Sequence, residues 1–120
     1  MPSETAPSGK EELAWLAIRD NGRLALDFVG QADAAALDAD TMRLYAAVRC
    51  LEIMSEAARR LRGAQQSRFS HLPWRDMEDA GNVYRHVYDK LSTSRILATI
   101  RNHVPAMIEA AMAAVGDEPA

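Results

Sequence analysis

Hydrophobic residues recur with a helical period along most of the chain. The first stripe predicts a helix from about Lys10 to Val29, in which Glu11 and Glu12 complement the positive end of the helix dipole. The positions expected to face inward are Trp15, Ile18, Ala25 and Val29. Gly22 weakens the prediction in the middle of this helix, and Gly30 is a natural stop for it.

The second stripe is the most regular one and predicts a helix from Thr41 to about Leu61, with Asp40 or Thr41 as its N-cap. The positions expected to face inward are Leu44, Val48, Leu51, Met54, Ala58 and Leu61. Gly63 closes this helix. The preceding segment "QADAAALDAD", residues 31–40, is predicted to be a connection.

Shorter helices are predicted in the rest of the chain. "AQQSRFSHLPW" is expected to be a loop or a short helical turn ended by Pro73, and a helix follows from about Trp74 to Tyr88. Its inward positions are expected to be Met77, Ala80, Tyr84, Val87 and Leu91. "STSRILATIRNHVP" and "AMIEAAMAAV" predict two further helices separated by Pro105. The pattern therefore predicts an all-α fold, an antiparallel bundle of four or five helices with short loops.

The length of 120 residues suits one domain, which we expect to span residues 10–115 between a disordered leader, 1–9, and a frayed tail, 116–120. A domain of this size buries only about two-thirds of the surface that its unfolded chain exposes, so oligomerisation is an expected source of stability. The N-terminus lacks the apolar core of a signal peptide, and no apolar run is long enough to span a bilayer. The expected compartment is the cytoplasm, without a membrane partner.

The charge balance argues against a general polyanion binder but leaves room for a local phosphate site. Formal net charge is −3, yet 12 of the 14 basic residues are arginines, and ten of these lie between Arg43 and Arg101. Arginine presents a planar fork that matches phosphate oxygens. A GC-rich coding bias explains the same abundance equally well.

Polar residues gather in "GNVYRHVYD", residues 81–89. On a helix, Asn82, Arg85, His86 and Asp89 share one face because their spacing is i, i+3, i+4 and i+7. One interpretation is a solvated face with an Arg85–Asp89 ion pair. The other is a phosphate site, in which the imidazole moves a proton, the guanidinium stabilises the phosphate, and the amide positions either of them. His86 and Tyr88 point about 200° apart on a continuous helix, so both reach one groove only from different sides.

No metal or cofactor site is predicted elsewhere. The three histidines, His71, His86 and His103, lack metal-ligand spacing, and the single Cys50 excludes both a disulfide and a Cys-based metal site. We expect Cys50 to be buried or half-buried, and His71 and His103 to lie in loops or helix caps. Any catalysis should therefore be metal-independent acid–base chemistry on a substrate that carries its own nucleophile. RNA fits, because its 2′-hydroxyl can attack the adjacent phosphate.

The order of these motifs resembles that of the HepT-like branch of the HEPN families. "LEIMSEAARRL", "HLPWRDMEDAGNVYRHVYD" and "ILATIRNHVPAM" carry the resemblance, which extends over residues 12–112. These families are small all-helical proteins, usually the toxin half of a two-gene toxin–antitoxin system. The resemblance therefore implies an endoribonuclease toxin of a type VII-like system.

The resemblance also implies a mechanism and partners. Active members are similar in being metal-independent endoribonucleases without a cofactor, whose homodimers line one composite RNA cleft. The partner is typically a minimal nucleotidyltransferase antitoxin, which in some systems transfers AMP to the motif tyrosine. Carried over by residue, the motif histidine, tyrosine and asparagine are His86, Tyr88 and Asn82.

The motif arginine does not carry over, because Gly81 occupies the position five before His86. Arg85 is the hypothetical substitute. If it fails, the chain is an inactive or altered module that binds RNA or its partner without cleaving, and a third interpretation treats residues 81–89 as only a dimer seam. Gly81 itself indicates either a tight backbone approach, for instance to another subunit, or a neutral substitution.

Overall fold

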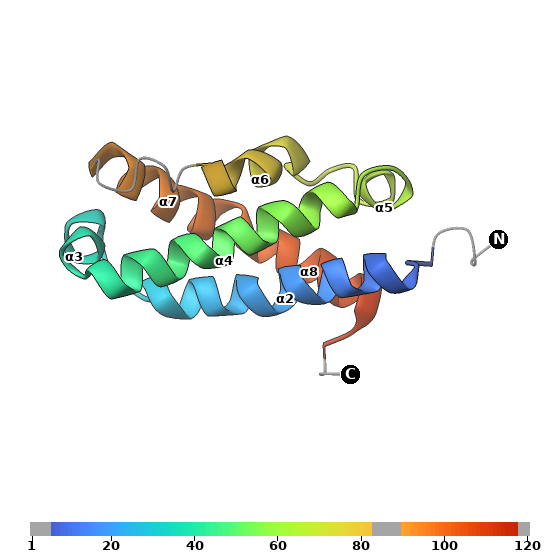
Figure 1. Cartoon of the computed structure of the whole chain (residues 1–120), viewed down its shortest axis with the longest axis horizontal. Helices are drawn as coiled ribbons and strands as arrows, with labels where there is room; N and C mark the ends of the chain where they lie inside the picture. Colours follow the sequence, from blue (N-terminus) through green and yellow to red (C-terminus); the bar gives the residue numbers. More distant parts are fainter. Residues whose placement is uncertain (1–5, 83–89, 118–120) are drawn as a thin grey trace.

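The described chain is built from helices alone. The computed structural model describes residues 6–82 and 90–117. Its long helices are α2 (Gly9–Val29), α4 (Thr41–Arg60), α7 (Lys90–Asn102) and α8 (Val104–Val115), and its short helices are α3 (Ala34–Ala39), α5 (Ala64–Arg68) and α6 (Trp74–Ala80). The predicted all-α bundle is thus confirmed (Figure 1). None of these helices is long and apolar enough to cross a membrane. The ends of the expected leader and tail, residues 1–5 and 118–120, lie outside the described ranges.

Side-chain caps fix where the two longest helices begin. Ser8 and Glu11 form a reciprocal cap before Gly9: the Glu11 N–H donates to Ser8 Oγ at 3.2 Å, and the Ser8 N–H donates to Glu11 Oε1 at 2.9 Å. At the start of α4 the Asp40 carboxylate accepts from the Arg43 N–H at 3.2 Å. Asp40 is therefore the N-cap, the first of the two residues predicted for that position.

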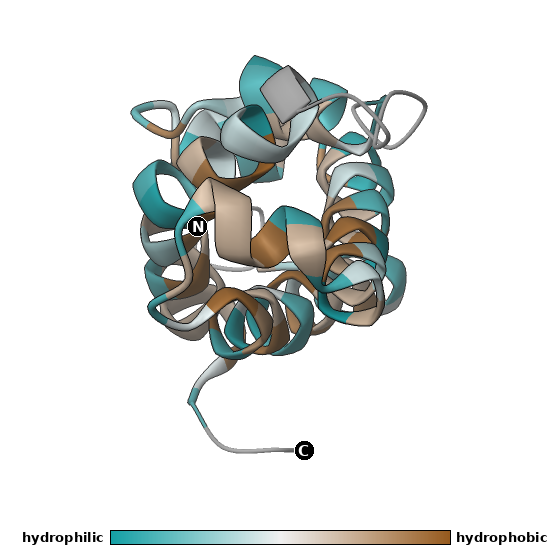
Figure 2. Cartoon of the chain, turned by 90° about the vertical axis from the view of Figure 1, so that its left-hand side faces the viewer, coloured by the Kyte–Doolittle hydropathy of each residue, from teal (hydrophilic) through white to brown (hydrophobic). Residues whose placement is uncertain are grey.

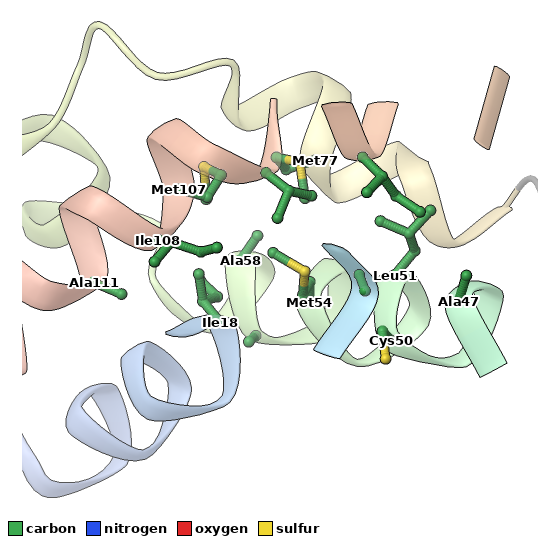
Figure 3. Close-up of a cluster of buried hydrophobic side chains, with 14 of the residues drawn as sticks. Ile18, Ala47, Cys50, Leu51, Met54, Ala58, Met77, Met107, Ile108 and Ala111 are labelled. Atoms are coloured by element: carbon green, nitrogen blue, oxygen red, sulfur yellow. The ribbon is translucent and has the colours of Figure 1, made fainter. Parts of the chain in front are cut away.

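Helices α2 and α4 run antiparallel and form the centre of the bundle, with α8 packed against α2 and α6 against α4 (Figure 1). Every inward position predicted for α2 and α4 is buried, and so is Cys50. Hydrophobic segments of the helices turn toward the interior of the bundle, and hydrophilic ones turn outward (Figure 2). In the core, Met54 of α4 lies among Ile18 of α2, Met77 of α6 and Ile108 of α8 (Figure 3).

Gly22 strengthens this core, although glycine weakens the helix itself. A Cβ at this position would lie 2.7 Å from Ile108 Cγ1 and 3.2 Å from Val104 Cγ1, closer than side chains normally approach. The missing side chain therefore lets α8 cross close to α2. Tertiary packing outweighs local propensity here, and α2 continues through Gly22 without interruption.

The structure differs from the prediction in two of the connecting segments. The segment 31–40 contains a helix, α3, which begins where the Asp33 carboxylate accepts from the Ala36 N–H at 2.8 Å and which buries Leu37 completely. Pro105 does not separate two helices, because it lies in the first turn of α8. Proline is tolerated there, since the first N–H groups of a helix have no partner within it.

Candidate functional site

Of the four residues predicted to form the site, the structure describes Asn82. The predicted catalytic residues Arg85, His86 and Tyr88 lie outside the described ranges, as do residues 83–88 of the predicted third helix. Within the described part, helix α6 ends at Ala80, earlier than predicted, and residues 81 and 82 form a tighter turn. Asn82 is exposed at the end of this turn, next to the segment that carries the rest of the motif.

Gly81 is packed directly against α4 of the same chain. Its N–H donates to Ser55 Oγ at 2.6 Å, and the Ser55 hydroxyl donates to the Met77 carbonyl at 2.7 Å. A Cβ at position 81 would lie 2.9 Å from Ser55 Oγ and 3.2 Å from Glu52 Cα. Of the two explanations for Gly81, the structure supports the tight backbone approach, and the surface it approaches is α4 of the same chain.

A groove runs along α4 beside this turn, with a volume of about 320 Å³. Its lining residues come from α4 and from the turn after α6: Arg49, Glu52, Ser55, Glu56, Arg59, Gly81 and Asn82. From the sequence, Arg and Glu are expected away from the apolar stripe of this helix, but no site role is predicted for them. The signal was present, since Arg49, Glu52, Glu56 and Arg59 recur at i, i+3, i+7 and i+10, which places them on one side of α4.

The two arginines of the groove are held differently. Arg59 Nη2 donates to the Glu78 carbonyl at 2.6 Å, and its Nη1 donates to Glu56 Oε2 at 3.3 Å. Arg49 keeps 69% of its side chain exposed, and its Nη1 lies 4.0 Å from Glu52 Oε1. Arg59 thus ties α6 to α4, whereas Arg49 is mostly exposed and lines both this groove and a neighbouring one that Arg60 also lines.

Glu78 fixes the position of α6 relative to α4 and α5. Its carboxylate accepts from Arg62 and from Gln66 Nε2, the latter at 2.9 Å, and 12% of its side chain is exposed. The hydrogen bond from Arg62 holds the pKa of Glu78 below its usual range, and the bond from Gln66 acts in the same direction. Because Gly81 follows Glu78 by three residues, this network also sets the position of the turn that carries Asn82.

A second groove, of about 470 Å³, lies between α6 and α7. His103 Nε2 lies 3.6 Å from Asp76 Oδ2 there, and Asp79 and Arg95 also line it. The lining of this groove has two carboxylates and one arginine, whereas the α4 groove has two of each. The second groove therefore repels phosphate more strongly than the α4 groove does. His71 and His103 occupy a turn and the N-cap of α8, as predicted. The described residues contain no group of three His, Cys, Asp or Glu side chains placed to hold a metal ion.

Comparison with known proteins gives two matches. The family model described as "Ribonuclease HepT-like" matches residues 18–114. The Methanocaldococcus jannaschii protein named "Putative RNase MJ1380" is 25% identical over 88 residues, which cover 73% of this chain and 81% of that protein. No solved structure matches the chain significantly. The range matched by the family model contains α4, the α4 groove and the whole 81–89 motif.

Proposed function

The chain belongs to the HepT-like ribonuclease family, and on that premise we propose that it is a metal-independent endoribonuclease that cleaves single-stranded RNA. His86 carries the proton, Arg85 stabilises the phosphate charge, Asn82 positions the phosphate, and Tyr88 contacts the substrate. The observation that supports this proposal best is the place of Asn82. It lines a groove together with two arginines, and it immediately precedes the rest of the motif.

The chemistry uses the nucleophile that RNA supplies. The 2′-hydroxyl attacks the adjacent phosphorus, the bond from phosphorus to the 5′-oxygen breaks, and the products carry a 2′,3′-cyclic phosphate and a 5′-hydroxyl. One proton leaves the 2′-oxygen and one reaches the 5′-oxygen, and we assign both transfers to His86 because histidine is the usual general acid–base group near neutral pH. Guanidinium groups lower the barrier because negative charge grows on the phosphoryl oxygens in the transition state.

Cleavage in the presence of EDTA tests this function. We expect the wild-type protein to cut single-stranded RNA under these conditions and to leave cyclic phosphate ends. His86→Ala should lower the rate by about 100-fold or more, the usual effect of losing a general acid–base group. His71→Ala is the matched control, because His71 lies in an exposed turn away from the groove. Equal rates for wild type and His86→Ala would remove the catalytic role of His86.

The proposal extends to the partners. Two chains would form a homodimer whose motifs share one RNA cleft, and a minimal nucleotidyltransferase antitoxin would silence the protein by transferring AMP to Tyr88. Intact mass after incubation with a nucleotidyltransferase encoded beside this chain and ATP checks the transfer. The expected gain is one AMP per chain in the wild type and none in Tyr88→Phe. An unchanged wild-type mass would contradict the modification.

A second candidate function is a module that binds RNA or the antitoxin without cutting RNA. The packing of Gly81 favours it, because this position has no space for the arginine that active members usually carry there. Expression in cells separates the two candidates. Growth arrest that a neighbouring nucleotidyltransferase relieves supports the ribonuclease, whereas normal growth together with a stable complex supports the module.

A further inference from the structure

Position 81 cannot supply the guanidinium that a phosphate in this site would need. Even a single carbon atom there would meet Ser55 Oγ at 2.9 Å and the α4 backbone at Glu52 Cα at 3.2 Å. The backbone of α4 cannot move aside without disturbing the core, because Leu51 and Met54 of the same helix are fully buried. A phosphate ligand must therefore come from another element that borders the groove.

Helix α4 is that element, and its arginines differ in the hydrogen-bond partners that they already have. Arg43 donates to the carbonyls of Phe28 and Val29, at 2.8 and 3.1 Å. Arg59 donates to the Glu78 carbonyl at 2.6 Å. These guanidinium groups satisfy carbonyl oxygens near helix ends and cannot turn to a ligand without leaving those oxygens unpaired.

Arg49 differs from these two arginines because, among the described residues, its guanidinium makes only a long contact with a charged side chain. Its nearest charged partner within the described chain is Glu52, at 4.0 Å, which is too long for a hydrogen bond. Its side chain is 69% exposed, and it lines the same groove as Asn82. An exposed pair at this distance contributes little, so the guanidinium can exchange it for a stronger partner.

We propose that Arg49 is a phosphate-binding residue of the α4 groove and holds a phosphodiester of the RNA strand beside Asn82. The proposal rests on the proposed function, in that the ligand is RNA. The guanidinium supplies two parallel N–H donors to the phosphate oxygens, and the Asn82 side chain supplies a third polar contact from the other wall. The contribution comes from α4, outside the segment that carries the motif.

The glutamates of the groove make a further consequence testable. Glu56 accepts from Arg59 and lies 3.6 Å from Arg60 Nε, so its charge is already shared. Glu52 is the carboxylate nearest to Arg49 and competes with phosphate for it. Neutralising Glu52 should therefore increase the affinity for RNA, whereas the loss of Arg49 should decrease it.

The experiment measures binding and cleavage separately. Binding uses a short mixed-sequence single-stranded RNA with 2′-O-methyl groups, which lacks the attacking hydroxyl, and cleavage uses the unmodified RNA. Arg49→Gln should weaken binding and lower the cleavage rate by roughly 10- to 100-fold. It should also lower the slope of log affinity against log salt by about 0.7, the value for one phosphate contact on a single strand. Arg49→Lys should keep the slope and lose part of the affinity, and Glu52→Gln should bind more tightly than wild type.

Arg75→Gln is the matched control, because Arg75 is exposed on α6 and does not line this groove. It should stay within about twofold of wild type in both assays. Thermal unfolding of each variant confirms that the exposed substitutions leave the fold intact.

The outcomes separate this inference from the proposed function. Normal cleavage and binding by Arg49→Gln would overturn the role of Arg49 and leave the ribonuclease standing. A wild type that binds RNA without cutting it, with binding lost in Arg49→Gln, would refute the ribonuclease and support Arg49. A wild type that neither binds nor cuts RNA would overturn both.

Discussion

Several arginine side chains in the described part of the chain donate to backbone carbonyls. Arg43 donates to the end of α2, Arg59 donates to α6, and Arg101 donates to the Gly30 carbonyl at 3.2 Å. The sequence left two explanations for the abundance of arginine, a phosphate site and a coding bias. Helix-end contacts are a third use, which composition could not reveal because it depends on carbonyls that are distant in sequence.

The structural reason for glycine at positions 22 and 81 also cannot be predicted from the sequence. Both residues have ordinary helical conformations, so backbone freedom is not the reason for them. Each lies where another helix approaches so closely that a Cβ would collide with it. For Gly81 the sequence suggested two explanations, and only contacts with α4 could decide between them.

Restoring the family arginine at position 81 should damage the protein. Gly81→Arg must displace Ser55 or part of α4, and we expect a loss of roughly 1 to 3 kcal/mol in the free energy of unfolding from overpacking. We also expect no gain in RNA cleavage. Urea unfolding and the cleavage assay measure both quantities. Gly9→Arg is the control, because a Cβ there meets nothing within 4 Å. Wild-type stability together with faster cleavage in Gly81→Arg would show that the position has space for a catalytic side chain.

At the scale of elements, α6 depends on polar contacts more than the long helices do. It has seven residues and lacks a side-chain cap at its N-terminus. Trp74 at its start packs edge-on against Trp15 of α2, with ring centroids 5.7 Å apart. Near its end, the Glu78 carbonyl accepts from Arg59 of α4, and the Glu78 carboxylate accepts from Arg62 and from Gln66 of α5. The position of the turn at residues 81 and 82 follows from these two anchors.

Stability should fall in acid partly through Glu78. Its pKa is lower in the folded protein, so it contributes stability above the unfolded value of about 4.3, and this contribution is lost as pH falls toward the folded value. Glu78→Gln should be less stable than wild type by roughly 1 kcal/mol at pH 7. The difference should shrink as pH falls from about 5 to 3. Urea unfolding across this range measures it, with Glu109→Gln on the exposed side of α8 as control. A difference independent of pH would contradict the role of the Arg62 contact.

The sequence predicted the long helices well, because each buries an apolar stripe that repeats over several turns. It missed α3, which has six residues and buries little besides Leu37. So short a helix leaves no periodic stripe, although Asp33 three residues before Ala36 is an N-cap signal. It also extended α6 beyond Ala80, since the contact of Gly81 with Ser55 has no local signature.

For the whole molecule, association should control activity. If two chains share one RNA cleft, cleavage per chain should rise with protein concentration across the range in which the 13.2 kDa monomer becomes a dimer. Sedimentation and cleavage measured over the same dilution series check this. The two curves should share a midpoint. Constant cleavage per chain through complete dissociation would show that one chain is sufficient.

The motif residues of the site could be named from the sequence, whereas the groove could not. His86, Tyr88 and Asn82 follow from one local motif. Arg49 and Glu52 lie about 30 residues earlier in the chain, and only the packing of α6 on α4 brings them beside Asn82. A polar face on an amphipathic helix is usually solvated, so their spacing alone carried little weight.

Photo-crosslinking tests most directly whether RNA lies in the α4 groove. A single-stranded RNA that contains 4-thiouridine would be irradiated with the His86→Ala protein, and the crosslinked peptides identified by mass spectrometry. We predict crosslinks on α4 between Arg49 and Arg59 and beside Asn82. Crosslinks confined to the groove of Arg95 and His103, or to α2, would contradict an RNA site at Asn82.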